Sequence, residues 1–363
     1  MCKKIFIAAT GQHCGKTTTS LSLLHLARKK YSRVGFIKPF GPKRTKYLGQ
    51  FVDVDAALIA YVYGMENQLG LMSPVVLDSH TTRDVLEGKT TPQQYLEQIR
   101  HATAELEKQC DFLIIEGAGH SGVGSVVGLN NAQLAQQLDA PVLLVAGGGV
   151  GVVIDAIELN LALFRENGTE VRVIFPNKLI KSKREATLKY LQLAFKNTPI
   201  QIIGGFNYSP ILAHPTLKYL SELLRLELQA DSKQTSRIVH HIQLGAASTQ
   251  RIVDLLQEST LLIVPSSRDE VLVMLSTLYH LPEFQNKIAG LVIIGVAPLT
   301  EIVQRILDDA RIPYMRTAET TAEIYTTIQG DVAKIGAADK EKIALIQQLA
   351  ESDLNFELID SLF

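Results

Sequence analysis

The fold is decided near the start of the chain by residues 4–18, which read KIFIAATGQHCGKTT. The apolar run at 5–9 predicts a buried strand over 4–9, and the leucines that follow Thr18 predict a helix. A glycine-bearing loop between a strand and a helix turns its backbone N–H groups inward, and the helix dipole adds positive potential there. In such a loop Lys16 can reach the β and γ phosphates of a nucleotide, and the Thr17 hydroxyl can hold Mg²⁺. The stretch therefore predicts an α/β fold with a phosphate site after its first strand.

We expect a nucleotide to contact the whole loop, which comprises Gly11, Gln12, His13, Cys14, Gly15, Lys16, Thr17 and Thr18. The spacing departs from the usual pattern, because Thr10 stands where a glycine is usual, five residues before Gly15. The alternative is an incidental glycine turn, but the strand, the Gly-Lys-Thr-Thr sequence and the helix coincide. His13 either packs within the loop or contacts a substrate. Cys14 is interpreted as a small buried residue rather than a nucleophile, because no activating base is identifiable.

Residues 1–226 alternate apolar strands with amphipathic helices, which favours a doubly wound α/β domain with a mostly parallel sheet. Runs such as 112–115 and 142–145 are continuously apolar, as expected of strands that are covered on both faces. The expected strands lie at 4–9, 34–38, 112–115, 142–146, 171–175 and 200–204.

A polar stretch at about 227–236 interrupts this pattern, and we place a domain boundary there. A second, smaller α/β domain is expected over 237–351. Its strands are predicted at 238–244, 261–265, 291–294 and 313–316, and its helices near 250–257, 269–279, 300–309 and 321–328, with a closing helix at 339–351.

The composition is that of an ordinary globular chain and excludes several classes of protein. The 363 residues are 46% hydrophobic and 20% charged, with a net charge of -1, so neither a disordered chain nor a basic nucleic-acid-binding surface is expected. No apolar run approaches the roughly 20 residues of a membrane-spanning helix. The three cysteines form no CxxC motif, and reduced thiols are expected. We therefore expect a cytoplasmic protein with no nucleic-acid partner and no membrane partner.

Two carboxylates are candidates for a nucleotide-bound Mg²⁺, which takes one or two carboxylates beside the phosphates. Glu116 follows the run 112–115, and ligands in open α/β sheets bind at such carboxyl ends of strands. Asp55 is the second candidate, with a helix N-cap or first-turn acid as its alternative role. Lys38 ends the second strand, where its cation faces either a phosphate, an anionic substrate or water. Thr17, Asp55 and Glu116 are the predicted metal ligands.

Asn177 follows the strand predicted at 171–175. Its side chain presents both a donor and an acceptor, which suits the edge of a purine. The alternative is a turn residue that ends the strand.

Together, Gly15-Lys16-Thr17, Lys38-Pro39, Asp55-Ala56, Glu116-Gly117-Ala118-Gly119 and Asn177 resemble dethiobiotin synthetase and its relatives, which include the amidoligases that make cobyrinic acid diamides. The resemblance covers residues 1 to about 226. It implies that the loop Lys and Thr bind the phosphates of ATP and Mg²⁺, and that the two carboxylates complete the metal site. It also implies that Lys38 contacts phosphate and substrate, so that Lys16 and Lys38 are the catalytic residues, and that Asn177 reads adenine. His13 and residues 40–44 depart from the synthetase pattern, so we expect a different substrate.

The C-terminal part resembles the DRTGG domain through residues 262–270, 291–296 and 320–323. The pairing of these two domains is similar to the N-terminal regulatory half of long phosphate acetyltransferases, and we expect no acetyltransferase domain within the 363 residues. Arg268 and Asp269 form either a salt bridge within the domain or an anion site at a helix N-terminus.

Three functional hypotheses follow. In the first, the protein binds ATP and Mg²⁺, hydrolyses ATP slowly if at all, and senses an unidentified small molecule or protein through its second domain. In the second, it is an ATP-dependent ligase in which Lys16, Lys38 and Mg²⁺ stabilise the phosphoryl group during its transfer to a carboxylate or carbamate substrate, and an amine then captures the mixed anhydride. In the third, it is a partitioning-type ATPase, which ranks last because residues 10–12 lack the extra lysine of that class. Whether the protein is an enzyme stays open, and a homo-oligomer is expected.

Overall fold

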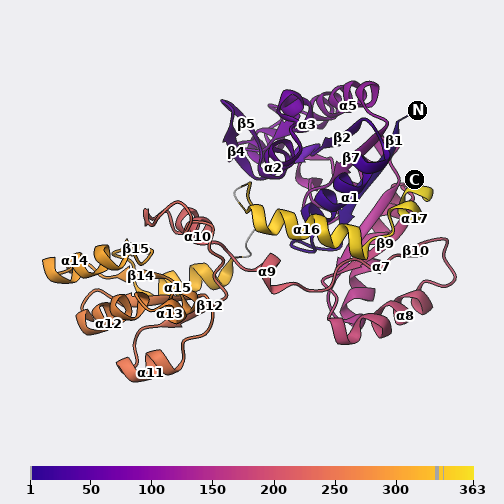
Figure 1. The fold of residues 1–363 in the computed structure, drawn as a ribbon. Helices are drawn as coiled ribbons and strands as arrows, with labels where there is room; N and C mark the ends of the chain where they lie inside the picture. Colours follow the sequence, from indigo (N-terminus) through magenta and orange to yellow (C-terminus); the bar gives the residue numbers. More distant parts are fainter. Residues whose placement is uncertain (1, 332–334, 338) are drawn as a thin grey trace. The chain divides into compact units, whose positions relative to one another are not determined.

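The computed structural model describes residues 2–331, 335–337 and 339–363, and the chain forms two compact units (Figure 1). The first unit comprises Met1–Tyr208 and Ile343–Phe363, and the second comprises Ser209–Lys342. This division differs from the expected domains, 1–226 and 237–351, at both ends.

Helix α10 (Leu217–Leu224) was expected in the first domain, but it belongs to the second unit, which begins at Ser209. Its Leu217, Leu220 and Leu224 are buried in one core cluster with Leu261 and Ile263, which belong to a strand of the second unit. The polar stretch at 227–236 therefore lies inside the second unit and does not separate the two.

A six-stranded parallel sheet forms the centre of the first unit, in the order β10-β9-β8-β1-β7-β2. Its strands are β1 (Lys3–Ala9), β2 (Val34–Ile37), β7 (Phe112–Glu116), β8 (Val142–Gly147), β9 (Val171–Asn177) and β10 (Gln201–Ile202). All five residues of β7 are buried, as the continuous apolar run predicts for a strand covered on both faces. The doubly wound, mostly parallel fold is confirmed.

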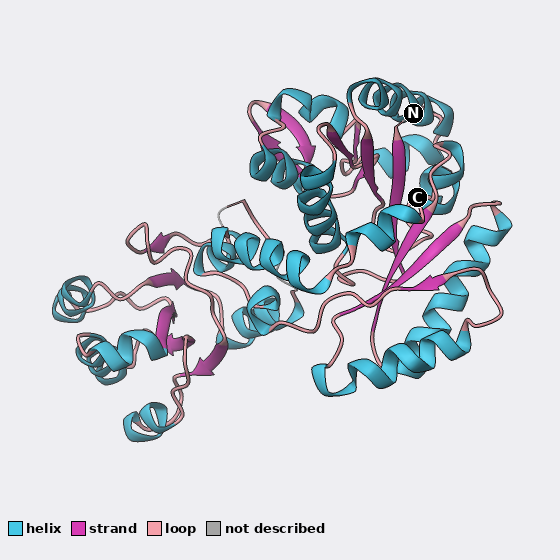
Figure 2. Ribbon diagram, turned by 45° about the vertical axis from the view of Figure 1, so that its right-hand side comes forward, coloured by secondary structure: helices cyan, strands magenta, loops and turns pink. Residues whose placement is uncertain are grey.

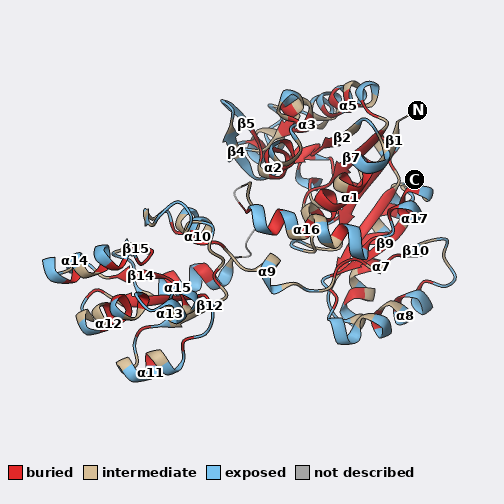
Figure 3. Cartoon of the chain, in the orientation of Figure 1, coloured by how far each residue is buried: buried red, intermediate tan, exposed pale blue. Residues whose placement is uncertain are grey.

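Helices lie around this sheet, as Figure 2 shows. They are α1 (Lys16–Lys30), α2 (Val54–Tyr63), α3 (Leu69–Met72), α4 (Thr81–Leu86), α5 (Pro92–Gln109), α6 (Asn131–Gln137), α7 (Val150–Glu166) and α8 (Arg184–Ala194), with short 3₁₀ turns at Glu66–Gln68, Ser125–Val127 and Lys181–Lys183. Side chains of α5, α6, α7 and α8 share one core cluster with the strands. Helix α1 contacts β1, β2 and β7. Figure 3 shows the strands buried beneath helices whose outer faces are exposed.

Two small pairs of strands, absent from the sequence prediction, lie between β2 and α5. Strands β3 (Phe40–Gly41) and β6 (Val75–Val76) pair in parallel, and β4 (Arg44–Tyr47) and β5 (Gln50–Asp53) form an antiparallel hairpin. The two central residues of the hairpin turn, Leu48 and Gly49, both have positive φ, the conformation that tight hairpins require. The hairpin leads directly into α2, because β5 ends at Asp53 and α2 begins at Val54.

The C-terminal segment returns to the first unit. Helix α16 (Lys340–Asp353) and helix α17 (Phe356–Ser361) are the yellow helices of Figure 1. Glu351 accepts from Lys29 of α1 at 2.6 Å, and the Phe356 ring packs edge-on against Phe112. The helix predicted at 339–351 therefore exists, but from Ile343 onward it belongs to the first unit and not to the second domain.

The second unit is built on a five-stranded sheet in the order β11-β15-β14-β13-β12. Only β11, an edge strand, is antiparallel to its neighbour. The strands are β11 (Leu228–Gln229), β12 (His241–Leu244), β13 (Thr260–Pro265), β14 (Ile288–Ile294) and β15 (Tyr314–Thr317). The helices are α9 (Pro210–Ala213), α10, α11 (Thr249–Asp254), α12 (Asp269–Tyr279), α13 (Pro282–Lys287), α14 (Glu301–Ala310) and α15 (Thr321–Gly330). Separate core clusters fill the two faces of this sheet.

Candidate functional site

Four strands of the first sheet end close to one another and carry the predicted site residues. The loop that holds Lys16 follows β1, Lys38 follows β2, Glu116 ends β7 and Asn177 ends β9. Because the strands are parallel, their carboxyl ends lie at one edge of the sheet, where α/β proteins bind ligands.

The glycine before the first helix sets the shape of the loop. Gly15 caps α1 with φ 102 and ψ 29, a left-handed conformation that favours glycine. A Cβ atom here would lie 2.3 Å from Nδ2 of Asn177, so no larger residue fits. The next residue, Lys16, is buried and its Nζ donates to the carbonyl of Gly119 at 2.5 Å. Burial, followed by repulsion from Lys38, lowers the pKa of Lys16 to about 8.

Lys38 lies between the two predicted metal-binding carboxylates. Its Nζ donates to Oε1 of Glu116 at 2.7 Å and to Oδ2 of Asp55 at 2.9 Å. All three side chains are less than a tenth exposed. Burial alone would lower the pKa of Lys38, but attraction to Asp55, Glu116 and Asp53 outweighs it and raises the pKa above its ordinary value. The structure thus holds one buried cation against a pair of buried anions.

Two hydroxyls on α1 complete the environment of Glu116. Thr17 Oγ1 donates to Oε1 at 3.1 Å, and Ser20 Oγ donates to Oε2 at 2.6 Å. Thr17 was predicted from the sequence, whereas Ser20 was not. A signal was present, because residues three apart lie on one face of a helix.

The end of the β4–β5 hairpin positions Asp55. Asp53 is the N-cap of α2, and its side chain accepts from the backbone N–H of Asp55 at 2.9 Å. Asp55 is therefore a first-turn acid that also pairs with Lys38, and the cap belongs to Asp53. The favourable helix dipole at this position stabilises the carboxylate of Asp55.

Asn177 connects the end of β9 to the loop. Its Nδ2 donates to the carbonyl of Cys14 at 3.0 Å, and its Oδ1 accepts from the backbone N–H of Phe206. In this structure the side chain holds the loop in place, and the reading of adenine stays a prediction. Asn160 of α7, which the sequence analysis did not single out, likewise donates to the carbonyl of Thr10.

The remaining loop residues predicted to bind nucleotide are Gly11, Gln12, His13 and Thr18. His13 adopts a left-handed φ of 58, so the loop contains a sharp turn before Gly15. Cys14 lies near the hydroxyl of Thr10, with Sγ and Oγ1 3.7 Å apart. Cys14 is only half-buried, so the prediction of a buried residue is wrong in this respect.

The donor set fits a magnesium ion that arrives with a nucleotide. Thr17 bonds to Glu116, and Lys38 bridges Glu116 and Asp55; these side chains offer hard oxygen donors, the ligands that Mg²⁺ prefers. No cluster of three or more His, Cys, Asp or Glu side chains that could hold a metal occurs among the described residues. Two carboxylates and a hydroxyl leave the other positions to water and phosphates, as is usual for Mg²⁺ at nucleotide sites.

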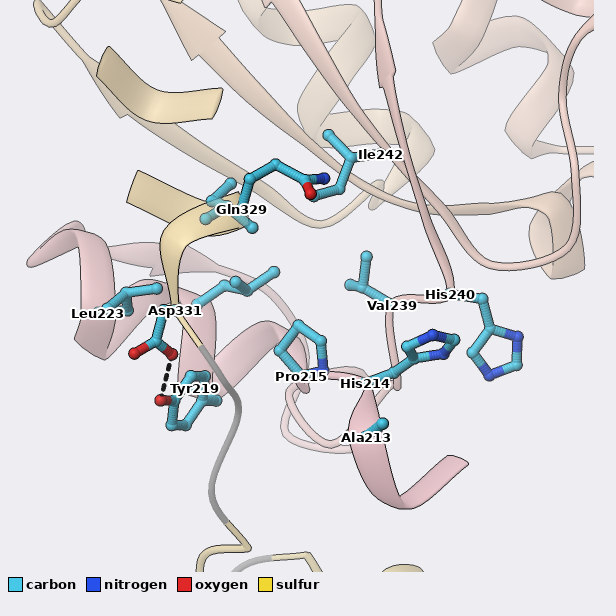
Figure 4. A pocket seen from close by; sticks show the side chains of 12 residues that line it. Ala213, His214, Pro215, Tyr219, Leu223, Val239, His240, Ile242, Gln329 and Asp331 are labelled. Atoms are coloured by element: carbon cyan, nitrogen blue, oxygen red, sulfur yellow. Dashed lines mark hydrogen bonds between the residues drawn. The ribbon is translucent and has the colours of Figure 1, made fainter. Parts of the chain in front are cut away.

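The second unit contains a cavity of about 240 Å³ on the face formed by α10 and α15. Figure 4 shows the rings of His214 and His240 side by side in its wall, with Tyr219 donating to Asp331 opposite them. The Nδ1 atom of His214 is buried and has no hydrogen-bond partner among the described residues. Burial, then repulsion from the neighbouring histidines and Lys342, lowers the pKa of His214.

Arg268 is engaged within the second unit. Its guanidinium donates to Glu270 and to the carbonyls of Gly245, Ala246 and Ala247, which form the loop after β12. The salt-bridge partner is therefore Glu270 and not Asp269. These bonds occupy guanidinium N–H groups of Arg268 that an anionic ligand would otherwise bind.

The family described as an AAA domain matches residues 3–216, and the DRTGG domain matches residues 220–330. The first match covers more than half of the chain, which therefore belongs to the AAA domain family, with a DRTGG domain following it. The predicted pairing of a nucleotide-type domain with a DRTGG domain is confirmed. No helix among the described residues is both long enough and apolar enough to cross a membrane.

Several curated proteins are similar at low identity. A phosphate acetyltransferase of Nitrosomonas europaea is 24% identical over 282 residues, which cover 75% of this chain and 39% of that protein. One of Haemophilus influenzae is 22% identical over 389 residues, covering 100% of this chain and 53% of that protein. An ATP-dependent dethiobiotin synthetase of Aromatoleum aromaticum is 28% identical over 152 residues, covering 42% and 68%. The chain thus spans about two fifths to half of the length of the phosphate acetyltransferases that it matches.

Among solved structures, the MinC:MinD cell division protein complex of Aquifex aeolicus matches with a TM-score of 0.37 and 15% identity, covering 58% of this chain and 84% of that chain.

Proposed function

With membership in this family as the premise, we propose that the protein binds ATP together with Mg²⁺ in its first unit and senses a ligand or partner through its second. The observation that supports nucleotide binding is the convergence of Lys16, Thr17, Lys38, Asp55 and Glu116. These side chains come from four separate segments, and each has the chemistry of a phosphate or magnesium ligand.

The buried Lys38 is the counter-charge of both carboxylates. Its ammonium group lies 2.9 Å from Oδ2 of Asp55 and 2.7 Å from Oε1 of Glu116. Asp55 and Glu116 are then ready to hold Mg²⁺, which when bound neutralises phosphate charge. Lys16 emerges from the first turn of α1, where the helix dipole also attracts phosphate.

The sensing role of the second unit is supported by its cavity and by the DRTGG match. A cavity of about 240 Å³ that combines apolar walls with two imidazoles suits a small organic molecule with a few polar groups. The experiment below separates this sensor from an ATP-dependent ligase by the amount of ADP released.

The test is a calorimetric titration of the purified protein with ATP in the presence of Mg²⁺, with ADP release followed in the same sample. We expect the wild-type protein to bind ATP. Lys16→Ala should weaken this binding by about 10- to 100-fold, because it removes one or two charged hydrogen bonds to the phosphates. Lys196→Ala is the matched control, because Lys196 is exposed on the first unit. Binding with little ADP release supports a sensor. Rapid ADP release on addition of a carboxylate substrate supports the ligase, and the absence of ATP binding contradicts the proposal.

A further inference from the structure

Two cysteines lie side by side at the amino-terminal ends of neighbouring strands. The Sγ atoms of Cys2 and Cys110 are 3.3 Å apart. Cys2 immediately precedes β1, Cys110 lies two residues before β7, and the strands pair in parallel with Lys3 opposite Phe112. This register puts Cys2 opposite Asp111, so Cys110 is its diagonal neighbour, one residue away along the strand direction. A strand spacing of about 4.8 Å and a rise of about 3.3 Å give a Cα separation of about 5.8 Å, which is within the range of about 4.4–6.8 Å that disulfides span. Closing a bond therefore requires a shift of the sulfur atoms and little movement of the backbone.

We propose that Cys2 and Cys110 are a redox pair that closes to a disulfide when the protein meets a hydroperoxide. The Cys2 thiolate attacks one peroxide oxygen, the O–O bond breaks, and Cys2 becomes a sulfenic acid while hydroxide leaves. The Cys110 sulfur then attacks the Cys2 sulfur, the S–O bond breaks, and water leaves. In sum, two thiols and one hydrogen peroxide give one disulfide and two waters, so the two sulfurs supply both electrons.

The surroundings of the two sulfurs assign these roles. Cys2 is half-buried and Cys110 is buried, so an oxidant reaches Cys2 first. The hydrogen bond from Cys110 lowers the pKa of Cys2, which favours its reactive thiolate form. The same hydrogen bond, followed by burial, raises the pKa of Cys110. Cys2 is therefore the attacking thiol and Cys110 the resolving thiol.

The crosslink joins the neighbouring strands β1 and β7 away from the nucleotide loop. The loop and Glu116 lie at the carboxyl ends of β1 and β7, whereas the cysteines lie at their amino ends. The bond would close a loop between positions 108 apart in sequence, and long loops give large entropic stabilisation of the folded state. We expect oxidation to raise the melting temperature of the first unit by about 5–10 °C.

The experiment treats the reduced full-length chain with a small excess of hydrogen peroxide and measures intact mass, free thiols and melting temperature. The expected result is a loss of two hydrogen atoms in mass, a fall from three thiols to one, and a rise in melting temperature that dithiothreitol reverses. Cys14→Ser is the matched control and should still form the bond. Cys2→Ser and Cys110→Ser should not.

Several outcomes overturn the proposal. Addition of oxygen atoms to the wild-type protein without loss of hydrogen would show that the sulfurs do not pair. Loss of two thiols in Cys2→Ser would show that Cys14 takes part instead. Cys110 is buried, so its variant is first checked for folding by circular dichroism. Cys2 is only half-buried, and Cys2→Ser carries the test if Cys110→Ser fails to fold.

Discussion

The ammonium nitrogen of Lys38 lies 2.7 Å from Oε1 of Glu116, and both side chains are almost completely buried. Asp55 shares the same cation at 2.9 Å. A buried ion pair adds little to stability compared with an apolar replacement, but removal of one partner leaves an unpaired charge in a region of low dielectric. The cluster is therefore most sensitive to loss of its single cation.

Lys38→Met should lower the free energy of unfolding by about 3–5 kcal/mol, because it leaves two carboxylates without a counter-charge. Urea denaturation at neutral pH measures the change. Lys46→Met is the control, since Lys46 lies exposed on the nearby hairpin and should change stability little. Equal stability of Lys38→Met and wild type would mean that the carboxylates are not charged in the folded protein.

Glu116→Gln should weaken ATP binding in Mg²⁺ by about 10- to 100-fold and should make it nearly independent of Mg²⁺. The amide keeps the size of the side chain but supplies a poorer ligand than a carboxylate. Calorimetric titrations with Mg²⁺ and with a chelator measure both effects. Glu97→Gln, an exposed change on α5, is the control. If Mg²⁺ strengthens binding equally in Glu116→Gln and wild type, Glu116 is not a metal ligand.

Arg268→Ala should leave ATP affinity within about twofold, because its guanidinium bonds only to groups of the second unit among those described. It should lower the stability of that unit by about 1–3 kcal/mol, since the carbonyls of the loop after β12 lose their donors. Thermal melting and the ATP titration test the two statements separately. Loss of nucleotide affinity would contradict separate ligand sites in the two units.

The positions of Glu116 and Asn177 in the fold could be predicted because both residues follow strands with strong signals. The continuous apolar runs before Glu116 and Asn177 identify parallel strands, and the carboxyl ends of such strands meet at one edge. Asp53 and Asn160 were missed, because Asp and Asn occur for many structural reasons and only the tertiary fold shows what they contact. Ser20 was missed although its spacing from Thr17 places both hydroxyls on one face of the helix. The β4–β5 hairpin was missed as well, because its short strands are mostly polar and carry little periodic signal.

The packing of the C-terminal helices on the first unit could not be predicted from the sequence, for a different reason. The apolar stripe of α16 shows that the helix is covered, but the stripe does not show which core covers it. Contacts of Glu351 and Asp360 with α1 decide this in the structure. Single charged contacts of this kind leave no pattern in a sequence.

Asp360 gives the final prediction, on the pH dependence of stability. Its carboxylate accepts from Tyr31 at 2.6 Å and pairs with Lys3 at 3.1 Å and with Lys30 at 2.9 Å, while its side chain is only 6% exposed. Burial alone would raise the pKa of Asp360, but the hydrogen bonds from these three groups outweigh it, and the pKa lies below its ordinary 3.8. A carboxylate with a lowered pKa contributes stability above the unfolded-state value, and this contribution is lost as pH falls through the folded-state value.

Asp360→Asn should therefore lower the free energy of unfolding at pH 7 by about 1–3 kcal/mol. The difference from wild type should persist down to about pH 4 and shrink below it, because the wild-type carboxylate then becomes protonated. Urea denaturation from pH 3 to pH 7 measures it. Glu357→Gln on the same helix is the control, because its exposed carboxylate should contribute little. A difference that stays constant down to pH 3 would mean that the charge of Asp360 does not hold α17 to the first unit, and that packing of Phe356 and Ile359 does so instead.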